Sequence, residues 1–421
     1  MQEDERTRLV VVTGLDRTST RGVCDRLLAD DPDAIVVHHD LRGLTEGIVR
    51  RDVRWATAES SAPAESSTVL ELAHGCVSCT LREDVLPLLR RLAGRGEVRR
   101  IVLHLDPVLE PEPVCWALAN VVVGEGTVTD VLDVEAVTAV VDEGTWLADA
   151  TGDGDLSECH GRDFAVTPDE DRTLAQVAVG QVAFADALVI TGRADDGWDA
   201  VRLAAVLDRL APGAPRATFG DDLPSVLQAV PVSARRGVID DPHAPLLRGT
   251  PPLGADAGVA LTLFADPRPF HPERLHDAMD VLFDGVVHTR GRAWVASQPD
   301  VALWVESAGG SLRIGHAGGW LAGADDAEWD RVDAQRRAKA ALDWHPRFGD
   351  RTQELLILTH QVSPEAITDA LRGALLTDAE LAEGEDAWRG YADPFGAWHT
   401  DPCDDFESTD TTTADSRKDQ A

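Results

Sequence analysis

The chain has 421 residues, with 39 basic against 74 acidic side chains and a formal net charge of −35. This charge argues against nucleic-acid binding by the bulk surface, because phosphate binding needs clustered cations. No apolar run approaches the ~20 residues of a membrane span, and the N-terminal residues lack a signal-peptide pattern. We therefore expect a cytoplasmic protein. The only lysines are Lys339 and Lys418, so the first three hundred residues contain no site that uses a lysine.

The first half of the chain alternates short apolar runs with helical patterns. The runs predict buried strands, the first ending at Gly14 and the others at 34–40, 67–73, 98–105, 137–142 and 185–191. Helices are predicted between them at 81–94, 111–122 and 172–184. Continuous apolar strands that alternate with helices indicate a mostly parallel sheet covered on both faces. We therefore expect a doubly wound α/β domain over residues 5–235.

The pattern changes after residues 236–257, which are rich in Pro, Gly and Asp and predict a linker. Beyond it, strands are predicted at 259–265, 285–297, 301–307, 311–317 and 354–360, with helices at 271–283 and 363–376. This order predicts a smaller α+β domain over residues 258–395. Residues 396–421 are acidic and rich in Ser and Thr, and we expect a disordered tail.

The turn after the first strand, GLDRTSTRG at 14–22, is where a phosphate-binding P-loop would lie. A P-loop uses backbone N–H groups, a Lys and a Mg²⁺-binding Ser or Thr. Here Thr20 replaces the Lys and Arg21 the hydroxyl residue, although Arg17 or Arg21 could contact a phosphate. Asp195 approximates the base-binding carboxylate of Asn-Lys-x-Asp, but the Asn and Lys are absent. Together with Gly14, these residues predict a degenerate nucleotide site. Such a site is compatible with either retained or lost binding of GTP and Mg²⁺, and efficient hydrolysis is not expected.

Cys76 and Cys79 follow a predicted strand, and Thr80 with Glu83 predicts a capping box for the next helix. The Cys-x-x-Cys spacing suits a tetrahedral zinc ion, but also a redox disulfide or a turn with no special role. Zinc would need further ligands. Strand ends converge in a doubly wound sheet, and four histidines near such ends are candidates: His38, His39, His74 and His104.

These motifs together resemble the CobW family of P-loop GTPases and metallochaperones. The stretch GCVSCTLRED reproduces the family's Gly-Cys-x-Cys-Cys and Leu-Arg-Glu-Asp pattern, with Ser78 in place of the middle cysteine. Further matches are LEPEPV, VVDEGTWL, RPFHPERL, RGRAWVAS and WHPRFGDRTQELLIL. The resemblance implies a P-loop GTPase-like domain followed by a CobW C-terminal domain, with zinc as the metal.

The departures from the family pattern point to one branch. The P-loop Lys, the Asn-Lys-x-Asp motif and the middle cysteine are missing, and His104 replaces a carboxylate of typical members. The arginine-rich composition and the HHD motif are similar to an actinobacterial branch that recruits a ribosome hibernation factor under zinc limitation. The resemblance thus implies a zinc-responsive protein whose partners are the ribosome and this factor. A GTP-binding zinc metallochaperone and a thiol–disulfide regulator are the alternatives.

Overall fold

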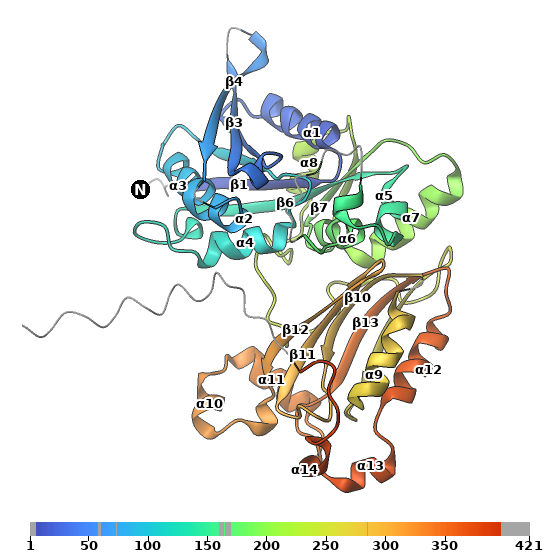
Figure 1. The fold of residues 1–421 in the computed structure, drawn as a ribbon. Helices are drawn as coiled ribbons and strands as arrows, with labels where there is room; N and C mark the ends of the chain where they lie inside the picture. The colour runs from blue at the N-terminus through green and yellow to red at the C-terminus, as the bar shows by residue number, and fades with distance from the viewer. Residues whose placement is uncertain are drawn as a thin grey trace, which may run out of the picture.

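The computed structural model describes residues 6–57, 60–72, 74–159, 164, 170–283 and 285–396. Within these residues the chain builds two sheets, each with its own helices (Figure 1). The larger sheet has eight strands in the order β4-β3-β2-β5-β1-β6-β7-β8, and the smaller has five in the order β12-β11-β10-β13-β9. None of the helices in these ranges is both long and apolar enough to cross a membrane.

The central strands of the larger sheet are parallel, which confirms the predicted fold class. These strands are β1 (Thr7–Gly14), β2 (Ala34–Asp40), β5 (Arg100–His104), β6 (Leu132–Asp142), β7 (Ala187–Thr191) and β8 (Arg216–Thr218). All of them except β8, whose sequence is Arg-Ala-Thr, contain a short apolar run, as expected for strands buried on both faces. Their carboxyl ends meet at one edge of the sheet, where the candidate site lies.

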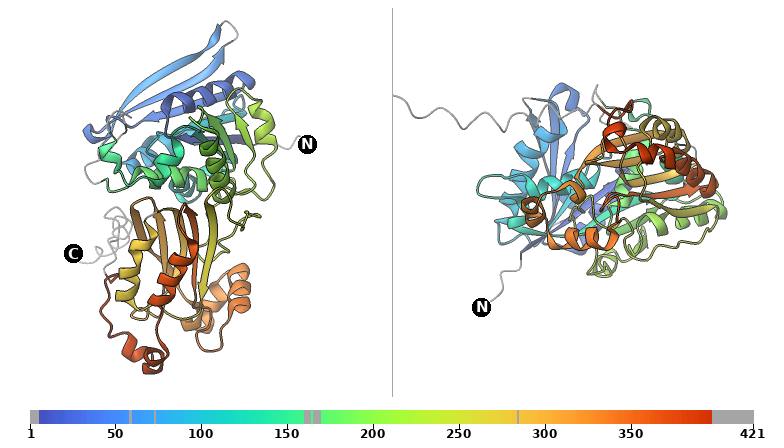
Figure 2. Two further views of the ribbon diagram at one scale, coloured as in Figure 1. Left: turned by 90° about the vertical axis from the view of Figure 1, so that its right-hand side faces the viewer. Right: turned by 90° about the horizontal axis from the view of Figure 1, so that it is seen from below.

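An antiparallel hairpin extends the other end of this sheet. It consists of β3 (Ile48–Thr57) and β4 (Ser60–Glu71), and it projects away from the second sheet (Figures 1 and 2). The apolar pattern predicted the second half of β4 as a separate strand, and β3 was not predicted. The sequence of β3, IVRRDVRWAT, alternates apolar and charged residues, so a search for continuous apolar runs passes over it.

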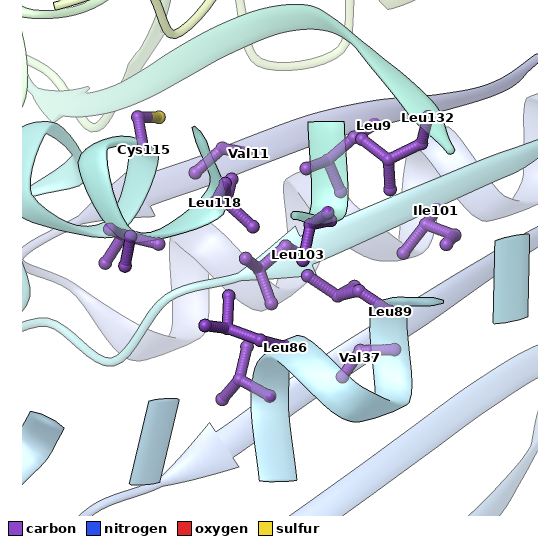
Figure 3. Packing of buried hydrophobic residues seen from close by; sticks show 14 of the residues in the cluster. Leu9, Val11, Val37, Leu86, Leu89, Ile101, Leu103, Cys115, Leu118 and Leu132 are labelled. Carbon is purple, nitrogen blue, oxygen red and sulfur yellow. The ribbon is translucent and has the colours of Figure 1, made fainter. Parts of the chain in front are cut away.

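Helices cover both faces of the larger sheet. On one face, α3 packs over Leu9, Val37 and Leu103 and α4 contributes Leu118 (Figure 3). On the other face, α1 and α8 pack over Val10, Val36 and Val102. The helices of this half are α1 (Arg17–Asp30), α2 (Val77–Thr80), α3 (Leu86–Ala93), α4 (Pro111–Asn120), α5 (Trp146–Thr151), α6 (Leu174–Ala183), α7 (Gly197–Leu210) and α8 (Leu223–Gln228).

The smaller sheet is antiparallel throughout and lies between two helical layers. Its strands are β9 (Val259–Asp266), β10 (Val286–Ala293), β11 (Val301–Ala308), β12 (Ser311–Gly319) and β13 (Gln353–His360). One face packs on α9 (Pro272–Ala278) and α12 (Pro364–Ala374). The other face shares a core with α5, α6 and α7 of the first half. The remaining helices are α10 (Asp326–Arg331), α11 (Ala334–Asp343), α13 (Asp378–Glu383) and α14 (Glu385–Trp388).

Candidate functional site

The turn between β1 and α1 is too short for a phosphate cradle. Strand β1 ends at Gly14 and α1 begins at Arg17, so only Leu15 and Asp16 connect them. The Asp16 carboxylate accepts the N–H of Ser19 at 2.7 Å and caps the helix. An anion at a helix start is stabilised by the free N–H groups and the helix dipole. The chain's own carboxylate therefore occupies the position that a phosphate would take.

Gly14 and Thr20 have structural roles in this turn. The Thr20 hydroxyl is buried and donates to the Asp16 carbonyl at 2.7 Å. A Cβ atom on Gly14 would lie 2.8 Å from the Thr20 hydroxyl oxygen and 2.8 Å from the Val140 carbonyl oxygen. Glycine is therefore required here because β1, β6 and α1 approach closely. Neither residue needs a phosphate to account for it.

Arg17 is held by carboxylates from the ends of the neighbouring strands. Its guanidinium lies 2.8 Å from Asp106 and 4.0 Å from Asp40. The Asp106 side chain is fully buried and also accepts the N–H groups of Leu41 at 3.1 Å and Val108 at 3.4 Å. Burial raises the pKa of Asp40, but hydrogen bonds from Arg42 outweigh this and bring it to about 2. The Asp40 carboxylate is therefore ionised at neutral pH. Both Asp40 and Asp106 bind cationic side chains.

The other two candidates for nucleotide contact lie elsewhere. Arg21 is exposed and pairs with Glu65 of the β3–β4 hairpin at 3.3 Å and with Asp25 at 3.8 Å. Asp195 is exposed in the turn before α7. Among the described residues, the structure brings Gly14, Arg17 and Thr20 together and leaves Arg21 and Asp195 apart from them.

A pocket of about 430 Å³ remains beside this turn, at the ends of β1, β6 and β7. Its charged lining residues are Asp16, Asp142, Asp149 and Arg17. Three carboxylates against one guanidinium make a negative site, which repels a triphosphate. Within the described lining, Arg17 is thus the cationic side chain left to meet a triphosphate, the helix start is capped and the P-loop lysine is missing.

The histidines of strand β2 point to opposite faces of the sheet, because adjacent strand residues alternate. His38 lies on the α1 face, where its Nδ1 donates to the His104 carbonyl at 3.0 Å and its ring stacks on the His104 ring at 4.2 Å. Both ring nitrogens of His104 are buried without a hydrogen-bond partner in the described part of the chain. Burial lowers the pKa of His38, and burial with the adjacent His38 lowers that of His104 well below its usual value. This stacked pair is therefore neutral at pH 7.

His39 lies on the opposite face and binds a carboxylate. Its Nε2 is 2.8 Å from the Asp84 carboxylate, which Arg51 also contacts at 2.6 Å. Burial raises the pKa of Asp84, but the hydrogen bonds from His39 and Arg51 outweigh it and the pKa lies below its usual value. This ion-paired cluster ties β2 and β3 to the helix that follows the cysteines. The sequence analysis missed Asp84, although it lies within the LRED motif.

Cys76 and Cys79 stand at the start of α2. Cys76 is the N-cap, and its Sγ accepts the N–H of Cys79 at 3.2 Å. Thr80 is already helical, so the predicted capping box of Thr80 and Glu83 is wrong and the cap lies one turn earlier. Residues 81–85 continue as a π-helical turn into α3, a distortion often found at functional sites. Both cysteines are partly exposed thiols.

The six candidate metal ligands fall into three places. Cys76 and Cys79 share the start of α2, and His74 is exposed just before them, its carbonyl accepting the Cys76 N–H at 3.0 Å. The other ligands lie in the stacked pair and in the ion-paired cluster described above. Across the described ranges, no three His, Cys, Asp or Glu side chains are placed to hold one metal ion. A closed four-ligand zinc centre is therefore not formed within the described part of the chain.

Comparison with known proteins identifies the family. Residues 42–216 match the CobW/HypB/UreG nucleotide-binding domain, and residues 259–375 match the cobalamin synthesis protein cobW C-terminal domain. The first match begins after the turn at 14–22. The zinc chaperone Rv0106 of Mycobacterium tuberculosis is 45% identical over 405 residues, which cover 94% of this chain and 95% of that protein.

Two further relatives carry zinc in their names. The zinc-regulated GTPase metalloprotein activator 1 of Dictyostelium discoideum is 27% identical over 80% of this chain and 72% of that protein. The zinc chaperone CobW of Pseudomonas aeruginosa is 30% identical over 48% of this chain and 47% of that protein. The identity of 45% along nearly the full length of both chains, with two adjacent domain matches, shows that this chain belongs to the CobW family.

Proposed function

We propose that this protein is a zinc chaperone that takes up Zn²⁺ on Cys76 and Cys79 and passes it to a client protein. The observation that carries the proposal is the pair of partly exposed thiols at the start of α2, with the Cys-x-x-Cys spacing that one zinc ion can bridge. The names of the related proteins support zinc as the cargo.

The open coordination of this pair suits transfer. A structural zinc site has four protein ligands and is closed, whereas two thiolates leave positions for water or for a client's side chains. His74 is exposed on the same segment, and its side chain would have to move toward the thiols to become a third ligand. His39 is held by Asp84 at 2.8 Å, and His38 by the His104 carbonyl at 3.0 Å, so these histidines keep structural roles. Zinc bound to the thiols would therefore exchange without unfolding the domain.

Zinc titration of cysteine variants tests this proposal. Competition with a chromophoric chelator should show one tightly bound Zn²⁺ per wild-type chain. Loss of a residue that only orients a metal ligand weakens metal binding about 10–100-fold. Loss of a ligand itself, in Cys76→Ser or Cys79→Ser, should therefore weaken it by about 100-fold or more. Cys159→Ser, which removes a partly exposed thiol outside this motif, is the matched control. Unchanged affinity in both motif variants would refute the proposal.

The buried thiols do not disturb this titration. Burial raises the pKa of Cys24 and of Cys115 to about 12, so both stay protonated and do not bind zinc at neutral pH. The same variants test the thiol–disulfide alternative. That alternative predicts a reducible bond between Cys76 and Cys79 under mild oxidant and no zinc affinity in the reduced protein.

We further propose that the chain works without a GTP cycle. The support comes from the Asp16-capped helix start and the pairing of Arg17 with Asp106 at 2.8 Å. The GTP-binding metallochaperone alternative makes the opposite prediction. Calorimetric titration with GTP and Mg²⁺ should give no heat of binding, and micromolar binding with magnesium-dependent hydrolysis would overturn this second proposal while leaving the zinc proposal intact.

Recruitment of a hibernation factor to ribosomes under zinc limitation stays a prediction. It is favoured by the same closed turn, because an adaptor acts through protein contacts and needs no nucleotide turnover. A pull-down with the full chain from zinc-starved and zinc-replete lysates tests it. Ribosomal proteins and a hibernation factor should be enriched from the starved lysate, and their absence from both lysates would refute the recruitment role.

A further inference from the structure

A second cavity lies where the two halves of the protein meet, on the side of the larger sheet away from Asp16. Its volume is about 200 Å³. The walls come from the turn before β7, the end of α7, parts of the segment 231–251, and strands β9, β10 and β13. Because these walls belong to both halves, a molecule bound here would contact both.

Four arginines line this cavity, which is unusual in a chain with a net charge of −35. They are Arg209, Arg235, Arg248 and Arg290. The opposing carboxylates are fewer. Asp240 pairs with Arg235 and Arg248, Glu306 lies opposite Arg290 on β11, and Asp186 lines the wall.

Asp186 is the acidic residue of the lining, and its charge, together with that of Glu112, attracts Arg235 and Arg248. Its carboxylate accepts the main-chain N–H groups of Val137 at 2.9 Å and Arg236 at 3.1 Å. Burial raises its pKa above the usual value. The lining itself thus carries four arginines and one carboxylate, and the other opposing carboxylates stand behind it.

Two buried side chains of the cavity wall have nitrogens without a hydrogen-bond partner among the described residues. Arg209 is 4% exposed, and its Nε has no hydrogen-bond partner within the described residues, while its two terminal nitrogens donate to the carbonyls of Ala205 and Gly254. His288 is 7% exposed, and within the same ranges neither of its ring nitrogens has a hydrogen-bond partner at normal geometry. Buried polar groups are usually paired, so these nitrogens are exceptions in the wall of the cavity.

The arginines also repel one another. Burial, and then the charge of Arg235, lower the pKa of Arg248 to about 10 and that of Arg290 to about 10. Two or more guanidinium groups that share a partly buried space are stabilised when an oxyanion accepts their N–H groups. The planar guanidinium fork matches the oxygens of phosphate.

We propose that this cavity binds a small phosphomonoester, with its phosphate on the arginines and its apolar body against the leucines of the wall. The apolar part of the lining is formed by Leu210, Leu246, Leu261, Leu356 and Leu358. The ligand bridges the two halves, since Arg209 belongs to α7 and Arg290 to β10. The site is independent of the zinc thiols, so it stands or falls separately from the proposed chaperone function.

Calorimetry on the full chain in EDTA, which excludes zinc phosphate, tests this site. The probes are inorganic phosphate, phenyl phosphate and phenol. Phenyl phosphate should bind more tightly than inorganic phosphate, and phenol should give no heat. Equal affinity for the two phosphates would keep the anion site but overturn the apolar subsite. Binding of phenol as tight as phenyl phosphate, or no heat with either phosphate, would overturn the proposal.

Two arginine variants locate the binding. Arg248→Gln should weaken phenyl phosphate at least tenfold, and its side chain is 35% exposed, so the fold tolerates the change. Arg290→Gln should do the same and serves as a second variant. Arg216→Gln is the matched control, because Arg216 pairs with Asp208 at 2.8 Å and does not line the cavity. Equal losses in Arg248→Gln and Arg216→Gln would place the binding elsewhere and overturn the assignment.

Discussion

Replacing Arg17 with methionine tests whether this side chain is committed to Asp106 or available for a phosphate. The Asp106 side chain is fully buried, and the Arg17 guanidinium lies 2.8 Å from it with 22% of its side chain exposed. Removing one partner of a buried ion pair costs about 3–5 kcal/mol. Because the N–H groups of Leu41 and Val108 still hold the carboxylate, we place the loss at the lower end, about 3 kcal/mol.

Urea unfolding at neutral pH, followed by circular dichroism, measures this loss. The matched control is Arg26→Met, on the same helix, which breaks an exposed pair with Asp30 at 3.0 Å. An exposed pair of this kind contributes about 0.3–0.5 kcal/mol. If the two variants lose equal stability, the pairing of Arg17 with Asp106 does not hold the turn closed. GTP binding to wild type that disappears in Arg17→Met would refute the reasoning directly.

Two further substitutions probe the second half of the chain. Burial, and then the charges of Glu110 and Glu112, raise the pKa of Glu306 from 4.5 to about 7. Between these two pH values the folded protein keeps a proton that the unfolded chain has lost. The stability of the protein therefore falls as the pH rises from about 4.5 to 7. Glu306→Gln should therefore gain up to about 3 kcal/mol over wild type at pH 8 and little at pH 4.5; equal differences in urea midpoint at both pH values would contradict this. Gly309→Ala should cost about 1–3 kcal/mol of stability, which lowers the thermal midpoint by several degrees. The reason is that Gly309 has φ +55° and that an added Cβ would lie 2.1 Å from the carbonyl oxygen of Gly152 in the other half. Gly315→Ala, with no atom within 4 Å of the added Cβ, should leave the midpoint unchanged, and equal shifts in the two variants would refute the account.

The strand pattern of the first half could be predicted because burial on both faces requires continuous apolar sequence. Strands such as β1, LVVV within Thr7–Gly14, and β6 satisfy this local rule. The β3–β4 hairpin escaped it because β3 lies toward the edge of the sheet, where one face carries charged side chains. There the antiparallel partner, which is a tertiary feature, decides the structure.

The cysteine and histidine site shows the same division. The spacing of Cys76 and Cys79 suits a zinc ion, and equally leaves open a redox disulfide or a turn with no special role. The split of His38 and His39 between the two faces follows from strand alternation. However, the partner of His39, Asp84, comes from the helix after the cysteines, and only the fold brings it to 2.8 Å.

The sequence by itself determined that this member of the family lacks the lysine of a P-loop, because a lysine missing from the first three hundred residues cannot be supplied by folding. Only the tertiary structure decided what replaced it. The helix starts at Arg17, Asp16 caps it, and Asp106 from the end of β5 neutralises Arg17. Charge pairing depends on distance in space, and that distance is set by the parallel register of β1 and β5, which local sequence patterns do not contain.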